Sequence, residues 1–180
     1  MRVVAYCAHS FQNATERAAG VAPLTCPPLS EATWPTIRRR IDGAEFIYLD
    51  LHGQENDAAW YGDDGIVAMT AEQLSTAQLA DAVVFAVNCH LGDPGAPMAR
   101  ALFAAGVSHL IAGEGPNYGP PSGPLYGGPL LGLWLRRFFG IGFGVPKALR
   151  AAKRVAAWRG GGAYVVEDVM AFQAIDRDVT

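Results

Sequence analysis

The chain has 180 residues, a formal net charge of −3 and 51% hydrophobic residues, which fits one ordinary domain with a sizeable buried core. Its basic residues are scattered apart from three arginines at positions 38–40, and this composition argues against nucleic-acid binding. The longest apolar stretch, residues 127–145, is interrupted by two arginines, so we expect no membrane association. Three cysteines at unrelated spacings indicate free thiols, and with a start too polar for a signal peptide they favour a cytoplasmic location.

The first part of the chain predicts two strands separated by a weaker region and a helix. Residues 2–8 form an apolar run typical of a buried strand, and residues 9–13 are its polar exit. Residues 25–28 include two prolines and suggest an irregular connection. Residues 30–41 begin with a capping serine and continue with apolar side chains at helical spacing, which indicates an amphipathic helix. A second buried strand is predicted at 45–51.

A hairpin and a short helix are predicted next. Within residues 58–69, Asp64-Gly65 lies between apolar flanks, which is the signal of a tight turn, and we expect the arms of this hairpin at the edge of the main sheet. Thr70 and Gln73 match the capping-box pattern that begins a helix. An apolar run at 82–89 then predicts a third buried strand.

The next segments predict a helix, a strand and a long loop. Residues 94–106 have apolar side chains on one helical stripe and end at a glycine, and residues 107–112 form another buried strand. Residues 113–128, called the Gly-Pro loop here, contain six Gly and four Pro. These are too many for a regular element, and we expect a loop over the functional site.

The chain closes with two predicted helices, at 130–139 and 146–158, and with partly alternating apolar residues at 163–175. Strands interleaved with helices predict an α/β fold of three layers, in which a mostly parallel sheet lies between two layers of helices. The sequence contains no internal repeat, so we expect a single domain over residues 1–180.

Two of the predicted strands end in reactive side chains. The run at 46–51 is followed by His52, and the run at 82–87 is followed by Asn88 and Cys89. Catalytic groups of open α/β sheets lie at the carboxyl ends of strands. The segment between His52 and Cys89 is long enough for a crossover that makes the two strands parallel. A thiol and an imidazole at one edge of a sheet suggest a cysteine nucleophile.

Further segments accompany this pair in a fixed order. They are an apolar strand ending in His-Gly at 49–53, Met-Thr-Ala-Glu-Gln-Leu at 69–74, the nucleophile strand at 83–89, Cys-His-Leu-Gly at 89–92, and helical segments at 99–107 and 145–152. In this order they resemble the caspase-like cysteine peptidases, and within them the CHAT domains and the metacaspases. The resemblance covers roughly residues 44–158.

This resemblance implies a caspase-like α/β/α sandwich, here a single CHAT-type domain, and cysteine endopeptidase activity on a protein or peptide substrate without a cofactor. Cys89 would attack the peptide carbonyl, and His52 would act as the general acid/base that protonates the departing amine. The backbone N–H groups of Gly53 and Cys89 would form the oxyanion hole. A glycine at position 53 has no Cβ, so the substrate carbonyl can approach the backbone closely.

The resemblance does not extend to a preference for basic residues. Metacaspases of this kind carry an aspartate two residues before the nucleophile, where this chain has a valine. Asp93, Glu114 and, as a third choice, Asp50 are the acidic candidates for a substrate pocket, and each also has a simpler explanation as a helix cap or a solvated loop charge. Tyr118 and Asn117 are expected to line the same cleft from the Gly-Pro loop.

Four alternatives stay open at this point. One is a catalytically silent domain of the same fold, or one that needs an activating protein partner, although the presence of both His52 and Cys89 weighs against it. Another is a different α/β thiol hydrolase or amidotransferase, whose nucleophile usually lies in a Gly-x-Cys-x-Gly elbow that this chain lacks. A metal site of His52, Cys89 and His90 would lack the paired spacing of metal ligands. Finally, a free cysteine is often simply a small buried apolar residue.

Overall fold

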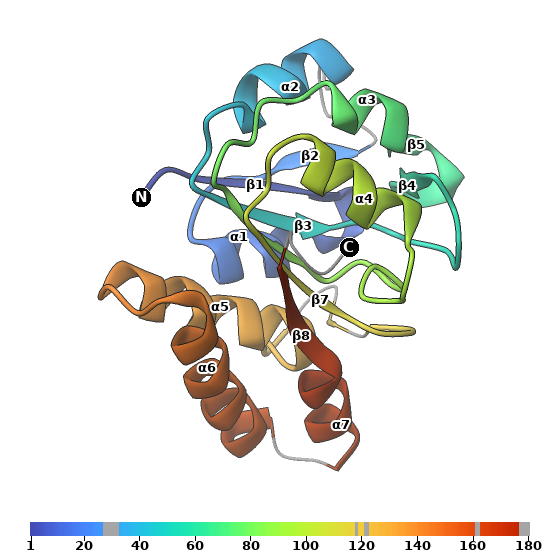
Figure 1. The fold of residues 1–180 in the computed structure, drawn as a ribbon. Coiled ribbons are helices and arrows are strands. Elements are labelled where there is room, and N and C mark those ends of the chain that lie inside the picture. Colours follow the sequence, from blue (N-terminus) through green and yellow to red (C-terminus); the bar gives the residue numbers. More distant parts are fainter. Residues whose placement is uncertain (27–32, 118, 121–122, 161–162, 177–180) are drawn as a thin grey trace.

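The computed structural model describes residues 1–26, 33–117, 119–120, 123–160 and 163–176. Its centre is a six-stranded sheet in the order β2-β1-β3-β6-β7-β8, in which the first five strands run parallel and β8 runs antiparallel to β7 (Figure 1). The strands of this sheet are β1 (Val3–Ala8), β2 (Leu24–Cys26), β3 (Phe46–Asp50), β6 (Val83–Ala86), β7 (His109–Gly113) and β8 (Phe172–Asp176).

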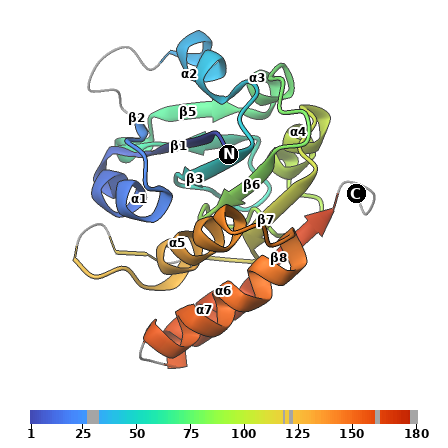
Figure 2. The same cartoon turned by 90° about the vertical axis from the view of Figure 1, so that its left-hand side faces the viewer.

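Helices cover both faces of the sheet, as Figure 2 shows. One layer consists of α2 (Trp34–Ile41), α3 (Ala71–Ser75) and α4 (Pro97–Ala104). The other consists of α1 (Gln12–Ala19), α5 (Gly127–Gly140), α6 (Val145–Gly160) and α7 (Ala163–Ala171). The predicted α/β class with a mostly parallel central sheet is therefore confirmed.

The central strands form because their side chains are apolar on both faces. In β3, Phe46 and Tyr48 enter the core under α5, whereas Ile47 and Leu49 enter the core under α2, α3 and α4. Adjacent side chains of a strand point to opposite faces, so one continuous apolar run supplies both cores. The four apolar residues of β3 are buried for this reason, and Asp50 at the end of the strand is buried as well.

The helix α5 lies close to the middle of the sheet because position 132 is a glycine. A Cβ on Gly132 would overlap the rings of Tyr48 in β3 and Phe85 in β6. These two rings also contact each other, with centroids 5.3 Å apart and planes at 59°. Close packing of a helix therefore supports the two strands that end near His52 and Cys89.

Most predicted elements are present, with small shifts in their ends. The capping box of α3 is confirmed, since the N–H of Gln73 donates to Oγ1 of Thr70 at 3.2 Å and the N–H of Thr70 donates to Oε1 of Gln73 at 3.0 Å. The predicted helix at 94–106 begins only at Pro97, because the residues after Cys89 form turns. The proposed serine cap of α2 lies outside the described residues.

Three elements differ from the sequence predictions. The polar exit after β1 is followed by a 3₁₀ turn, η1 (His9–Phe11), and by α1, whose buried residues are mostly small and gave little periodic signal. The predicted irregular connection contains the short strand β2, which pairs with β1. The closing segment divides into α7 and β8 rather than forming one element.

The hairpin forms as predicted, but it is not part of the main sheet. Its strands, β4 (Ala59–Tyr61) and β5 (Val67–Thr70), form a separate two-stranded sheet and are joined by a 3₁₀ turn, η2 (Asp63–Gly65). Trp60 and Met69 are buried in the same core as α2, α3 and α4. The hairpin thus lies across that face because its apolar side chains are buried there, and not at an edge. Over the described residues, no helix combines the length and the apolar character needed to cross a bilayer.

Replacing Gly132 with alanine tests the packing of α5 on β3 and β6. The added methyl group overlaps two buried rings, and overpacking of this kind lowers the free energy of unfolding by about 1–3 kcal/mol. Gly140 lies on the same helix with open space around its Cβ position, so Gly140→Ala is the matched control and should change stability by less than about 1 kcal/mol. Urea denaturation measures both, and equal midpoints for the two variants would contradict this packing.

Candidate active site

The ends of β3 and β6 are joined beyond the last residues of the sheet. The N–H of Val87 donates to the carbonyl of Leu49 at 2.8 Å, and the N–H of Leu51 donates to Oδ1 of the buried Asn88 at 3.0 Å. This side-chain bond continues the pairing of the two strands by one further step. The residue that follows each joined segment is therefore held at the same edge of the sheet.

His52 and Cys89 line one small cavity at this edge, with a volume of about 50 Å³, which we call the site cavity. The shared cavity agrees with the prediction that both residues lie at one edge of the sheet, and their catalytic roles stay predictions. The Gly-Pro loop also contributes to its wall through Asn117, Gly119 and Pro120, as expected of a loop over the site. Tyr118 lies outside the described residues.

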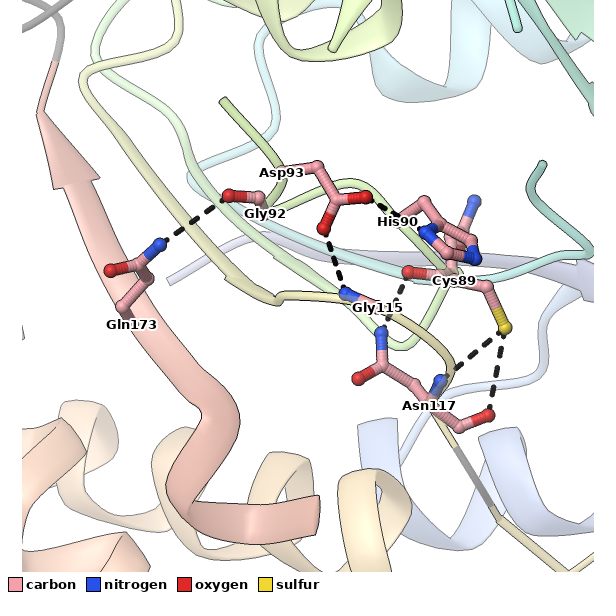
Figure 3. Close-up of polar contacts among 8 residues, drawn as sticks. Cys89, His90, Gly92, Asp93, Gly115, Asn117 and Gln173 are labelled. Carbon is pink, nitrogen blue, oxygen red and sulfur yellow. Dashed lines mark hydrogen bonds and ion pairs between the residues drawn. The ribbon is translucent and has the colours of Figure 1, made fainter. Parts of the chain in front are cut away.

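The Cys89 thiol is partly buried against the Gly-Pro loop (Figure 3). The backbone N–H of Asn117 donates to Sγ at 3.4 Å, and the thiol donates to the carbonyl of Asn117 at 3.6 Å. The Asn117 side chain is fixed as well, since its Nδ2 donates to the carbonyl of Asn88 at 2.8 Å. The sequence predicted Asn117 as a wall residue, but it gave no sign of a direct contact with the sulfur.

His52, which also lines the site cavity, is held in place by three neighbours. The backbone N–H of His52 donates to the carbonyl of Tyr61, and the backbone N–H of Tyr61 donates back to the carbonyl of His52, both at 2.9 Å. Its ring lies 5.1 Å from the ring of Phe11, and Nε2 lies 3.7 Å from Oδ1 of Asp63. The side chain is 49% exposed, so a proton on the ring can exchange with solvent.

Gly53 lies directly against the backbone of the nucleophile candidate. A Cβ at this position would overlap the carbonyl oxygen of Cys89. The packing of the two strand ends therefore requires a glycine at position 53, independently of any substrate that approaches the site. The predicted oxyanion role of the Gly53 and Cys89 N–H groups stays a prediction.

Two acidic pocket candidates lie outside the site cavity. Oδ2 of Asp93 lies 2.7 Å from Nδ1 of His90, and its Oδ1 accepts from the N–H of Gly115 at 2.7 Å. Glu114 accepts from Nε2 of Gln173 at 2.8 Å. Figure 3 shows Asp93 between His90 and the Gly-Pro loop, while the sulfur of the nucleophile candidate is directed toward Asn117. In this arrangement Asp93 fixes the loop.

The third acidic candidate, Asp50, does line the site cavity. It is only 5% exposed, and it accepts a hydrogen bond from Oγ1 of Thr15 at 2.9 Å. Desolvation by burial raises the pKa of Asp50 to about 7, even though the hydrogen bond from Thr15 acts in the opposite direction. Burial and the nearby Asp50 likewise raise the pKa of the Cys7 thiol to about 12, so this second thiol is unreactive at neutral pH.

A larger cavity, of about 480 Å³, lies between the start of α4 and β8. It is lined by Asp93 and Gln173 but by neither His52 nor Cys89. We therefore place the candidate site in the smaller cavity, because it is lined by the side chains that could carry out a reaction, and a larger volume alone does not indicate an active site. Within the described part of the chain, no group of three or more His, Cys, Asp or Glu side chains is arranged to hold a metal ion.

Comparison of the chain with protein-family models and with curated proteins finds no match.

Replacing Asp50 with asparagine tests the burial of a carboxyl group in the site cavity. The folded-state pKa of about 7 lies above the ordinary value near 4, so the unfolded chain loses its proton first and the free energy of unfolding falls as the pH rises from about 4 to about 7. Asp50→Asn should remove this decrease and raise stability at pH 8 by up to about 4 kcal/mol.

Urea denaturation between pH 4 and pH 8 measures this effect. Asp64→Asn is the matched control, because Asp64 is exposed in η2 and should leave the pH profile unchanged. If the stabilities of Asp50→Asn and the unmodified protein ran parallel over this range, the carboxyl group of Asp50 would not have the raised pKa.

Proposed function

We propose that this protein is a cysteine endopeptidase of the caspase-like type, with Cys89 as the nucleophile and His52 as the general acid/base. The observation that carries the proposal is the placement of both side chains around one cavity at the carboxyl edge of adjacent parallel strands. The chain segments that resemble the CHAT domains and metacaspases add to it. The proposed substrate class is a protein or peptide.

In the proposed reaction, the thiol of Cys89 gives its proton to the imidazole of His52, and the sulfur forms a bond to the scissile carbonyl carbon, whose oxygen takes the negative charge. The backbone N–H groups of Gly53 and Cys89 stabilise this oxyanion. The carbon–nitrogen bond then breaks, and the imidazole of His52 gives its proton to the departing amine. Water hydrolyses the resulting thioester, which releases the carboxylic acid and restores the thiol.

Three features support the pairing of these roles. The imidazole is half exposed, so a proton on the ring can also exchange with solvent. The thiol is partly buried and stays accessible from the cavity. The other two cysteines, Cys7 and Cys26, are buried, which makes them poor candidates for an enzymatic nucleophile.

A second candidate function is a form of the same domain that needs a partner for activity. The contact between Asn117 and the Cys89 sulfur favours it, because the loop backbone occupies one side of the nucleophile. The site cavity of about 50 Å³ is also small for a substrate side chain. A protein that moved the Gly-Pro loop would open the cavity and free the sulfur.

A mixture of denatured proteins tests both forms of the proposal. New peptide termini are identified by mass spectrometry after incubation with the unmodified protein, Cys89→Ala or His52→Ala. We expect cleavage by the unmodified protein and a loss of at least about 10³-fold in both variants, because the proposed chemistry needs each group. Cys26→Ala and His109→Ala are matched controls, since both residues lie away from the site cavity, and they should retain activity.

Two outcomes decide between the candidates. Cleavage that appears only when cell extract is added, and that Cys89→Ala abolishes, favours the partner-dependent form. No cleavage under either condition, or equal cleavage by Cys89→Ala, contradicts the peptidase.

A further inference from the structure

One acidic side chain beside the candidate site has no part in the proposed reaction. Asp63 begins η2, the turn between β4 and β5, and its Oδ1 lies 3.7 Å from Nε2 of His52. This separation is longer than a direct hydrogen bond but short enough for a significant electrostatic interaction. The sequence gave no sign of the pair, because Asp63 and the neighbouring Asp64-Gly65 match an ordinary turn.

Asp63 is held in place by both of its oxygens. The N–H of Ser10 in η1 donates to Oδ2 at 2.8 Å, and the Ser10 hydroxyl donates to Oδ1 at 2.6 Å. Partial burial alone would raise the pKa of Asp63, but the two hydrogen bonds from Ser10 and the nearby His52 outweigh it, and the pKa lies below its ordinary value. The carboxylate is therefore ionised at neutral pH.

The main chain of His52 is held close to η2, and its ring is in contact with η1. The reciprocal hydrogen bonds with Tyr61 join His52 to the residue two positions before Asp63, and the Phe11 ring lies against the imidazole. Phe11 directly follows Ser10, so the same 3₁₀ turn contacts both members of the pair. With Nε2 toward Asp63, Nδ1 is the other ring nitrogen that can exchange a proton.

From these contacts we infer that Asp63, anchored by Ser10, is a positioning residue that orients His52 and stabilises its protonated form beside Cys89. This inference rests on the proposed pairing of His52 with Cys89, and it adds two positioning residues, Asp63 and Ser10, to that pair. When the thiol gives its proton to the imidazole, a thiolate and an imidazolium form, and the carboxylate of Asp63 favours the imidazolium. Asp63 itself does not contact the substrate, and its carboxylate neither gains nor loses a proton during the reaction.

The expected effect is modest because the pair is partly exposed. The His52 side chain is 49% exposed and the Asp63 side chain 25%, and ion pairs of this kind are weak in water. Removing the charge in Asp63→Asn should therefore lower the rate of thiolate reactions at pH 7 by about two- to fivefold. The same change should move the pH at which that rate is half-maximal upward. Asp50, whose carboxyl group also lines the site cavity and has a pKa of about 7, is present in every variant, so the comparison between variants isolates the effect of Asp63.

Alkylation of Cys89 by iodoacetamide measures this without any substrate. The rate is followed from pH 6 to pH 9 by intact mass, with peptide mapping to locate the label, in the unmodified protein, Asp63→Asn, His52→Ala and the double variant. Asp63→Asn should slow labelling, and it should have no further effect when His52 is already alanine. Asp63→Glu should restore part of the rate, and Asp64→Asn, the exposed neighbour, should behave as the unmodified protein.

Slowing by Asp63→Asn that is equally large in the His52→Ala background would overturn the inference, and so would no slowing at all. Urea denaturation of each variant shows whether it is folded. If Asp63→Asn fails to fold, Ser10→Ala takes its place, with the same direction of change and the same dependence on His52 expected. The outcome is separate from peptide cleavage: coupling between Asp63 and His52 without cleavage contradicts only the peptidase, and cleavage without coupling contradicts only the role of Asp63.

Discussion

The hydrogen bonds that join the ends of β3 and β6 are the constraint on which the site depends. The Leu51 N–H reaches the side chain of Asn88 and not a backbone carbonyl, so the two chains stay together after regular pairing has ended. Gly53 allows the Cys89 backbone to lie against it at the next step. Below the same strands, Gly132 brings α5 into contact with their aromatic side chains. The position of the two reactive groups thus follows from backbone packing on both sides of the sheet edge.

The Gly-Pro loop is held against this edge by Asp93, which the sequence suggested as a substrate-pocket residue, and by the backbone of His90. Asp93 binds the N–H of Gly115, and the N–H of His90 donates to the Gly115 carbonyl at 2.7 Å. Among the described residues, Nδ2 of Asn88 and Oδ1 of Asn117 are buried without a hydrogen-bond partner. An unsatisfied buried polar atom costs about 1–3 kcal/mol, so these two amide atoms are an energetic cost of this arrangement.

The sequence predicted best what depends on one local pattern. The apolar runs of β3 and β6, the turn near Asp64 and the capping box at Thr70 are all signalled by adjacent residues. The placement of His52 and Cys89 at one edge then follows from the parallel pairing of the two apolar runs. Prediction from the sequence failed where tertiary contacts decide. The short β2 needs β1 as a partner, the hairpin is placed by the burial of Trp60, and the Asp63–His52 pair joins elements whose approach no spacing indicates.

Covalent trapping is the measurement that tests the pairing of His52 with Cys89 most directly. The folded protein is incubated with a mixture of short peptides that end in a chloromethyl ketone, whose chloride leaves when the sulfur bonds to the methylene carbon, and the stable adduct is located by intact mass and peptide mapping. A nucleophile assisted by an imidazole gives one adduct, on Cys89, which forms much more slowly in His52→Ala, while Cys7 and Cys26 stay unmodified. An adduct that forms at the same rate without His52, or no adduct on Cys89 at all, would contradict a catalytic pair at this edge of the sheet.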